Sequence, residues 1–182
     1  MSEAASFPAR IVDLSLKLDA LIKRVCQFLV LATTFVLLVG LACNVGMRYL
    51  FKGGGVGWMV EIPSLLFPWM IAGGIILAAQ QGSHIAIDVL RDALPPAGRR
   101  ILIIFVNLVL VVAYLSLFSV LGEMMEIVSI ERSPLLDMPA SWSYSALAFC
   151  VMGLAVCSLL IVLRTVLAGE RAALSQSEEV SS

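Results

Sequence analysis

Long apolar runs separated by short polar segments dominate the sequence. An α-helix rises about 1.5 Å per residue, so about 20 apolar residues cross a hydrocarbon core about 30 Å thick. Hydrocarbon offers no partner to free backbone groups, so each such run is expected to be helical. The runs predict spans at residues 25–47, 60–80, 101–122 and 145–165. The predicted fold class is therefore an all-α integral membrane protein with four transmembrane helices.

The segment before the first span has helical periodicity of its own. Charged residues such as Asp13 and Lys17 lie mostly opposite its apolar stripe. This pattern predicts an N-terminal interfacial amphipathic helix in residues 1–24, bound to lipid at the cytoplasmic leaflet. The alternative is a helical extension of the first span that projects into water. The residues of the apolar stripe are Ile11, Leu14, Leu18, Leu21 and Val25.

The remaining chain divides into a four-helix transmembrane domain at residues 25–167 and a tail at 168–182. The tail is rich in Ser and Glu, a composition that predicts disorder. The first apolar run is longer than the 7–15 residues of a signal peptide, and no small-residue cleavage site follows it, so we expect a retained anchor. Nine Lys and Arg residues flank the spans on the side of the termini and three on the other side, which predicts that both termini are cytoplasmic.

Composition excludes several classes of function. The chain has 182 residues, of which 60% are hydrophobic and 14% charged, and its mean hydropathy is +1.01. Its net charge of −1 provides no basic excess for a nucleic-acid backbone, so we expect no nucleic-acid partner. The four cysteines fall within predicted spans and form neither a CxxC motif nor a Cys/His cluster, so we expect no metal and no redox cofactor.

Several polar and aromatic residues lie between the first two spans. Tyr49 and Trp58 suit the membrane interface, where an amphipathic ring meets both an apolar and a wet environment. Arg48 and Glu61 are expected at similar depth near the external face. An ion pair between them would relieve the desolvation of both charges. Two separately hydrated charges are the alternative.

The second span contains two prolines and several small residues. Pro63 falls in the first helical turn, where its missing N–H costs little. Pro68 lies deeper and frees the carbonyl of Ser64, which predicts a kink. Small residues beyond it, including Gly73, allow another helix to approach closely. That helix could belong to this chain or to another protein.

His84 and Asp88 follow the second span with HxxxD spacing. In a catalytic interpretation, His84 would act as a base oriented by Asp88. No nucleophile is paired with them, so we expect an interfacial histidine that fixes the end of the span or the next loop. We expect no enzyme activity.

The order of these features resembles a known family. With its four-span topology and both ends inside, the chain resembles the small permease subunit of tripartite ATP-independent periplasmic (TRAP) transporters. Pro139, Trp142 and Tyr144 before the fourth span agree with this resemblance. The features that carry it are Arg48-Tyr49-x-Phe51, Trp58, Glu61, Pro68-Trp69 with Gly73, His84-Ile85 with Asp88, and Leu94-Pro95.

The resemblance implies a division of labour in the bacterial inner membrane. A periplasmic solute-binding receptor protein captures an organic acid, such as a dicarboxylate, and delivers it to a large TRAP permease subunit that uses a sodium gradient. The small subunit would serve as a scaffold for that large subunit. The candidate structural or subunit-interface residues are Arg48, Tyr49, Trp58, Glu61, Pro68, Trp69, Gly73, His84 and Asp88.

Within that scheme, Trp69 and Gly73 are expected on one helix face in contact with the large subunit. Two other functions remain open, an accessory membrane protein of another complex and a small homo-oligomeric channel. A channel would be expected to present a polar, pore-lining face in at least one span, and no span shows one.

Overall fold

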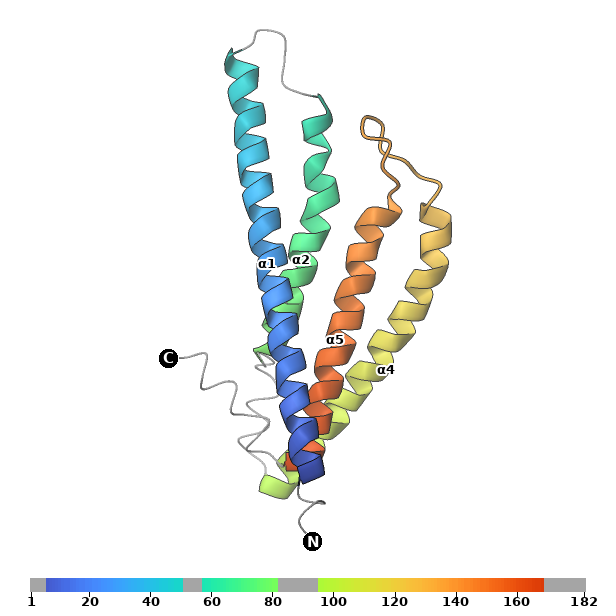
Figure 1. Cartoon of the computed structure of the whole chain (residues 1–182). Helices are drawn as coiled ribbons and strands as arrows, with labels where there is room; N and C mark the ends of the chain where they lie inside the picture. The colour runs from blue at the N-terminus through green and yellow to red at the C-terminus, as the bar shows by residue number, and fades with distance from the viewer. Residues whose placement is uncertain (1–5, 51–56, 82–94, 169–182) are drawn as a thin grey trace.

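The computed structural model describes residues 6–50, 57–81 and 95–168. In these segments four long helices are apolar and long enough to cross a membrane, which confirms the predicted fold class (Figure 1). Candidate spans cover Arg10–Leu50, Gly57–Gln80, Gly98–Val128 and Ser141–Leu167. The helical elements are α1 (Ser6–Leu50), the short 3-10 helix η1 (Gly57–Val60), α2 (Ile62–Gln80), α4 (Pro96–Val128) and α5 (Ser141–Ala168).

Helix α1 is a single element of 45 residues. At about 1.5 Å per residue it is about 67 Å long, far more than a hydrocarbon core requires. It has no break near residue 24, so the segment expected as a separate interfacial helix is continuous with the first span. This arrangement corresponds to the alternative of a helical extension. The position of the membrane surface along α1 stays a prediction.

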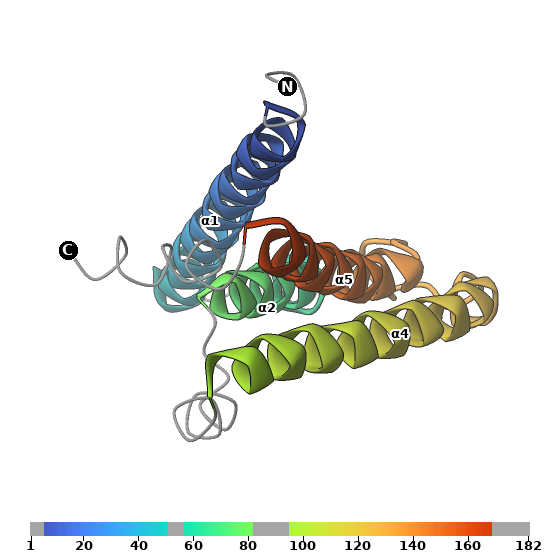
Figure 2. The ribbon, with the colours of Figure 1, turned by 90° about the horizontal axis from the view of Figure 1, so that it is seen from below.

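The helices form a bundle in which α2 and α5 occupy the centre. Helix α2 packs against both α1 and α5, whereas α4 packs mainly against α5. Seen along the bundle, α1 and α4 lie on different sides of the central pair (Figure 2). We call the end where α1 begins and α5 ends the lower end, and the opposite end the upper end, as they stand in Figure 1.

Small side chains allow the central helices to approach closely. A Cβ atom added to Gly73 would lie 2.8 Å from Cγ2 of Val30 on α1, and one added to Gly153 would lie 2.5 Å from Cδ1 of Ile76 on α2. The core therefore depends on thiols and small residues as well as on Ile76. Its fully buried cluster consists of Cys26, Ala72, Ile76, Ala146, Cys150 and Cys157.

The outward surface is strongly apolar. Phe28 is 74% exposed, Leu31 70% and Phe35 67%, all on α1, and many residues of α4 are similarly exposed. A soluble protein rarely leaves such large apolar areas uncovered. Lipid or another membrane protein must cover them.

Candidate functional site

Glu61 joins the start of α2 to the loop between α4 and α5 at the upper end. Its carboxylate accepts hydrogen bonds from the Ser133 hydroxyl, from the backbone N–H of Leu135 at 3.1 Å and from that of Leu136 at 3.0 Å. These donors lie more than 70 residues away in the chain. Glu61 therefore fixes the position of the α4–α5 loop relative to α2.

The α4–α5 loop has further internal bonds. The backbone N–H of Ser133 donates to the Met138 carbonyl at 2.9 Å, and that of Asp137 donates to the Ser133 carbonyl at 3.1 Å. Asp137 adopts a positive φ of 52°, a conformation that Asp tolerates better than most residues. Its carboxylate lies 3.3 Å from the Arg132 guanidinium. The loop is a closed, hydrogen-bonded turn.

Arg48 does not pair with Glu61. Arg48 is exposed in the last turn of α1, and among the described residues no ion pair joins it to Glu61. Tyr49, beside it, is 85% exposed, and Trp58, in η1, is 46% exposed. These three residues form an exposed polar and aromatic border at the upper end. The two charges are therefore separate, as in the alternative, but only Arg48 is exposed to solvent, because the α4–α5 loop binds the Glu61 carboxylate.

Pro63 and Pro68 occupy different positions in α2. Pro63 lies in the first turn, as predicted, and Pro68 lies inside the helix. The Ser64 carbonyl, which Pro68 deprives of its helical N–H donor, accepts a hydrogen bond of 3.0 Å from the Ser143 hydroxyl on α5. The proline therefore leaves no unpaired carbonyl here, and it creates a polar contact between two apolar helices.

Trp69 and Gly73 make contacts within the chain. The Trp69 ring centroid lies 5.5 Å from that of Trp142 and 5.9 Å from that of Phe149, both on α5. Gly73 is buried against α1. The structure therefore shows both residues packing within the four helices, which is the first of the two roles left open for Gly73. Contact of Trp69 and Gly73 with a large subunit stays a prediction.

A buried polar cluster, which we call the lower cluster, joins α1, α2 and α5. An ion pair of 3.1 Å connects Asp19 on α1 with Arg164 on α5, and their side chains are 10% and 4% exposed. Arg164 also donates to the Ser15 hydroxyl at 3.1 Å and to the Ser15 carbonyl at 3.0 Å. The Gln80 amide at the end of α2 donates to the Asp19 carboxylate at 2.7 Å. One cluster thus connects three helices.

Sequence reasoning missed the role of the lower cluster. Arg164 entered only the count of basic residues, because charges near a span end are ordinarily hydrated. A signal was present, since Ser15, Asp19, Ile22 and Cys26 recur every three or four residues, the spacing of one helix face. In the structure these residues face the bundle, while the predicted apolar stripe, with Leu14 58% exposed, faces outward.

His84 and Asp88 lie outside the described residues, so the expectations for them stay predictions. Among the described residues, no group of His, Cys, Asp and Glu side chains could hold a metal ion.

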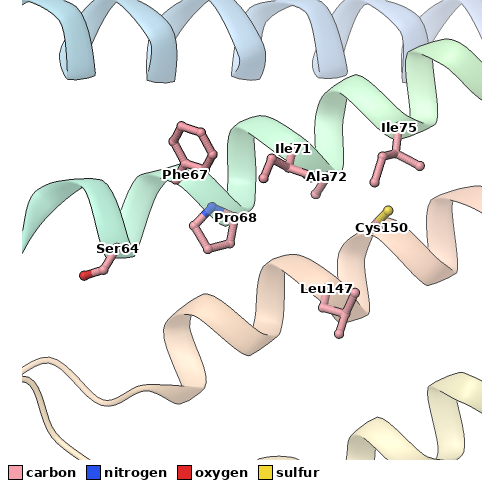
Figure 3. A pocket seen from close by; sticks show the side chains of 8 residues that line it. All are labelled: Ser64, Phe67, Pro68, Ile71, Ala72, Ile75, Leu147 and Cys150. Carbon is pink, nitrogen blue, oxygen red and sulfur yellow. The ribbon is translucent and has the colours of Figure 1, made fainter.

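A groove of about 360 Å³ lies between α2 and α5 (Figure 3). Apart from the Ser64 hydroxyl, which donates to the Glu61 carbonyl, its walls are apolar or a thiol. Such a lining offers an organic anion no convergent donors. The lining residues are Ser64, Phe67, Pro68, Ile71, Ala72, Ile75, Leu147 and Cys150.

Comparison with known proteins agrees with this architecture. An uncharacterized protein, y4mM, of Sinorhizobium fredii is 39% identical over 133 residues, which cover 73% of this chain and 25% of that protein. A Haemophilus influenzae protein named "Putative TRAP transporter small permease protein" is 24% identical over 131 residues, covering 72% of this chain and 79% of that protein. The chain thus spans about a quarter of the length of the first relative and most of the second.

The family model for the DctQ component of tripartite ATP-independent periplasmic transporters matches residues 37–168. This range contains η1, α2, α4, α5 and the upper part of α1, and so most of the described fold. The chain belongs to the DctQ family, the small permease component of TRAP transporters.

Proposed function

We propose that the chain is a static membrane subunit that holds the large permease subunit of a TRAP transporter in place and does not itself carry the solute. The observation that carries this proposal is that the main polar contacts of the spans are made within this chain, at the two ends of the bundle. Glu61 and the lower cluster bind groups of this chain at the two ends of the bundle, and the groove between α2 and α5 is apolar. A path for an organic anion would need polar donors between those ends.

The two polar contact sites suit a rigid frame. At the upper end, Glu61 and Ser64 connect α2 to the α4–α5 loop and to α5. At the lower end, Asp19 and Arg164 connect α1 to α5. A frame held at both ends resists sliding of its helices, which a subunit that supports a moving neighbour requires.

In the proposed orientation the lower end is cytoplasmic. Arg10, Lys17 and Arg24 lie at or near the lower end of α1, and Arg99 and Arg100 lie at the beginning of α4. Basic residues near span ends favour the cytoplasmic side. The α4–α5 loop then faces the periplasm, the side from which a receptor protein delivers its solute.

The proposed partner is the large permease subunit, which would use a sodium gradient to import an organic acid such as a dicarboxylate. Support for a larger partner comes from the Sinorhizobium relative, in which the segment similar to this chain occupies a quarter of one polypeptide. Such an arrangement keeps that segment at a fixed ratio to the rest of the chain. By analogy, we propose one copy of this subunit for each copy of the large permease subunit.

The first experiment is co-purification from membranes in mild detergent. The tagged chain is expected to recover the large permease subunit of its source organism in equal molar amount. Proteoliposomes containing both subunits are expected to take up solute only with the receptor protein and an inward sodium gradient, and those containing the small subunit alone are expected to take up none. Recovery of the chain only with copies of itself would contradict the proposal and favour a homo-oligomeric channel.

A matched pair of variants tests whether this subunit acts as a frame. Replacing Arg164 with Met removes its ion pair with Asp19 at the lower end, whereas replacing Arg132 with Met removes an exposed ion pair with Asp137 in the α4–α5 loop. The first change is expected to reduce uptake and recovery of the large subunit together, and the second to change neither. Loss of uptake with undiminished recovery and thermal stability would assign Arg164 to transport itself and contradict a static role.

A further inference from the structure

Helix α1 carries exposed apolar side chains along nearly its whole length. We call these residues, from Leu14 to Tyr49, the α1 ridge. They recur at every third or fourth position on the side away from Ser15, Asp19 and Cys26, which face the bundle. Leu14 is 58% exposed near one end of the ridge, Phe28 74% in its middle and Tyr49 85% at its other end.

The α1 ridge is too long for lipid alone to cover. From Leu14 to Tyr49 it extends about 52 Å, whereas hydrocarbon is about 30 Å thick and the bilayer with its headgroups about 40–45 Å. At the average helix tilt of about 20° the ridge still extends about 49 Å across the bilayer. Exposed apolar residues on α4, from Ile101 to Ile127, extend about 39 Å, a length that the bilayer with its headgroups can cover.

The lower part of the ridge lies among charges. Leu14, Leu18 and Leu21 are 41–58% exposed, and the exposed ion pair of Asp13 and Lys17 lies beside them on the helix. Exposed charges of this kind do not lie in hydrocarbon. The ridge therefore continues beyond the hydrocarbon on this side.

The lower cluster excludes the leaflet surface as the cover for these leucines. Asp19 and Ser15 bind Arg164 at the end of α5, and α1 passes this point without a break. The segment is thus held along the bundle and cannot lie flat on the membrane. The end of the ridge, at Leu14 and Leu18, projects past the headgroups, so another protein surface must cover it.

The spacing and charge of the ridge indicate the kind of partner. Apolar residues that recur about every 3.5 residues pack along a second helix as a left-handed coiled coil. Lys17 and Arg24 are exposed and flank the lower part of the ridge. A second copy of this chain, aligned in parallel in the membrane, would bring the exposed cations Lys17 and Arg24 to this level with one exposed carboxylate, Asp13, so positive charge would predominate on both sides. Acidic side chains on a different protein complement them.

We propose that a long helix of the large permease subunit packs along the α1 ridge and places acidic side chains against Lys17 and Arg24. This assignment rests on the proposed function, and it names the face that the frame presents to its partner. The contact extends from the cytoplasmic side to the periplasmic side of the membrane.

Site-directed photo-crosslinking in cells that produce both subunits tests the assignment. A benzoylphenylalanine side chain replaces Leu18, Phe28 or Val45 on the ridge, or Phe105 or Val112 on the exposed face of α4 as the matched control. Crosslinks to the large subunit, identified by mass spectrometry, are expected from the α1 positions at least fivefold more often than from the α4 positions. Crosslinks mainly from α4, only to lipid, or only to a second copy of this chain would overturn the assignment.

Charge reversal provides a second readout. The double variant Lys17→Glu with Arg24→Glu is expected to lower recovery of the large subunit at least fivefold, while Arg132→Glu in the α4–α5 loop leaves it unchanged. Undiminished recovery of the large subunit with the double variant would contradict the proposal that acidic side chains of that subunit lie against Lys17 and Arg24. If the wild-type chain recovers the large subunit but crosslinks from α4, only the ridge assignment fails. If it recovers none, the proposed function fails as well.

Discussion

Gly153 on α5 and Ile76 on α2 form a close contact between the two central helices. A Cβ at position 153 would lie 2.5 Å from Cδ1 and 3.0 Å from Cγ1 of Ile76, a residue only 1% exposed and therefore unable to move aside. Overpacking of a filled core costs about 1–3 kcal/mol. Gly153→Ala is expected to lower the melting temperature of the purified chain in detergent, measured by the loss of its tertiary near-UV signal.

Gly122 provides the matched control for this prediction. It lies on α4 with no atom within 4 Å of an added Cβ. Gly122→Ala is expected to leave stability unchanged or to raise it by up to about 1 kcal/mol, because alanine favours a helix over glycine. Equal effects of the two substitutions would show that the contact at Ile76 is not tight.

Substitutions of Trp69 distinguish the contribution of ring packing to stability from that of hydrogen bonding. Its ring lies against Trp142 and Phe149, but its indole N–H is buried without a hydrogen-bond partner among the described residues. Trp69→Phe is therefore expected to cost less than about 1.5 kcal/mol, whereas Trp69→Ala, which leaves a cavity, is expected to cost about 3–5 kcal/mol. Thermal unfolding of both variants in the same detergent measures the difference.

At the scale of elements, the lower cluster is expected to determine how α1 attaches to the bundle. Asp19→Ala breaks the buried ion pair with Arg164, and breaking a buried pair ordinarily costs about 3–5 kcal/mol. Asp13→Ala removes the exposed pair with Lys17, which is expected to cost less than about 0.5 kcal/mol. Unfolding free energies that differ by less than about 1 kcal/mol would contradict a stabilising role for the buried pair.

Glu61 is expected to determine the order of the α4–α5 loop. Glu61→Ala removes the acceptor for Leu135 and Leu136, so hydrogen exchange at these two amides is expected to become at least tenfold faster. Glu123→Ala, an exposed change near the end of α4, is expected to leave that exchange unchanged. Slow exchange in the Glu61 variant would mean that the internal bonds of the loop suffice.

At the scale of the whole molecule, truncation tests whether residues 1–24 are separate from the bundle. Ser15 and Asp19 make contact with α5, so removing residues 2–13 is expected to preserve the melting temperature and removing residues 2–24 to lower it. Arg164→Met in the longer truncation is expected to recover part of the loss, because it removes a charge that has lost its bonds to Ser15 and Asp19. Equal melting temperatures for the two truncations would show that residues 14–24 do not stabilise the bundle.

The four-helix fold was predictable because hydrocarbon permits few structures and the apolar runs are long enough to cross it. Pro63 and the carbonyl freed by Pro68 were equally predictable, since both effects are local to one helix. The contacts of Asp19, Glu61 and Gly73 were not. Each depends on which helix lies opposite. The spacing of Ser15, Asp19 and Cys26 indicates one face of α1, but no local pattern specifies its partner when both the outside and the inside of the bundle are apolar.

The lower cluster also has a consequence for biosynthesis. Ser15 and Arg164 are separated by 149 positions in the chain. Because synthesis begins at the amino terminus, Asp19 and Gln80 can bond to each other well before Arg164 is made, but the Asp19 carboxylate lacks this cation until the last helix inserts. An incomplete chain therefore carries a carboxylate without Arg164 at the lower end. The lower end of an incomplete chain is therefore chemically different from that of a complete chain. We expect this difference to allow a membrane protease to recognise and degrade incomplete chains.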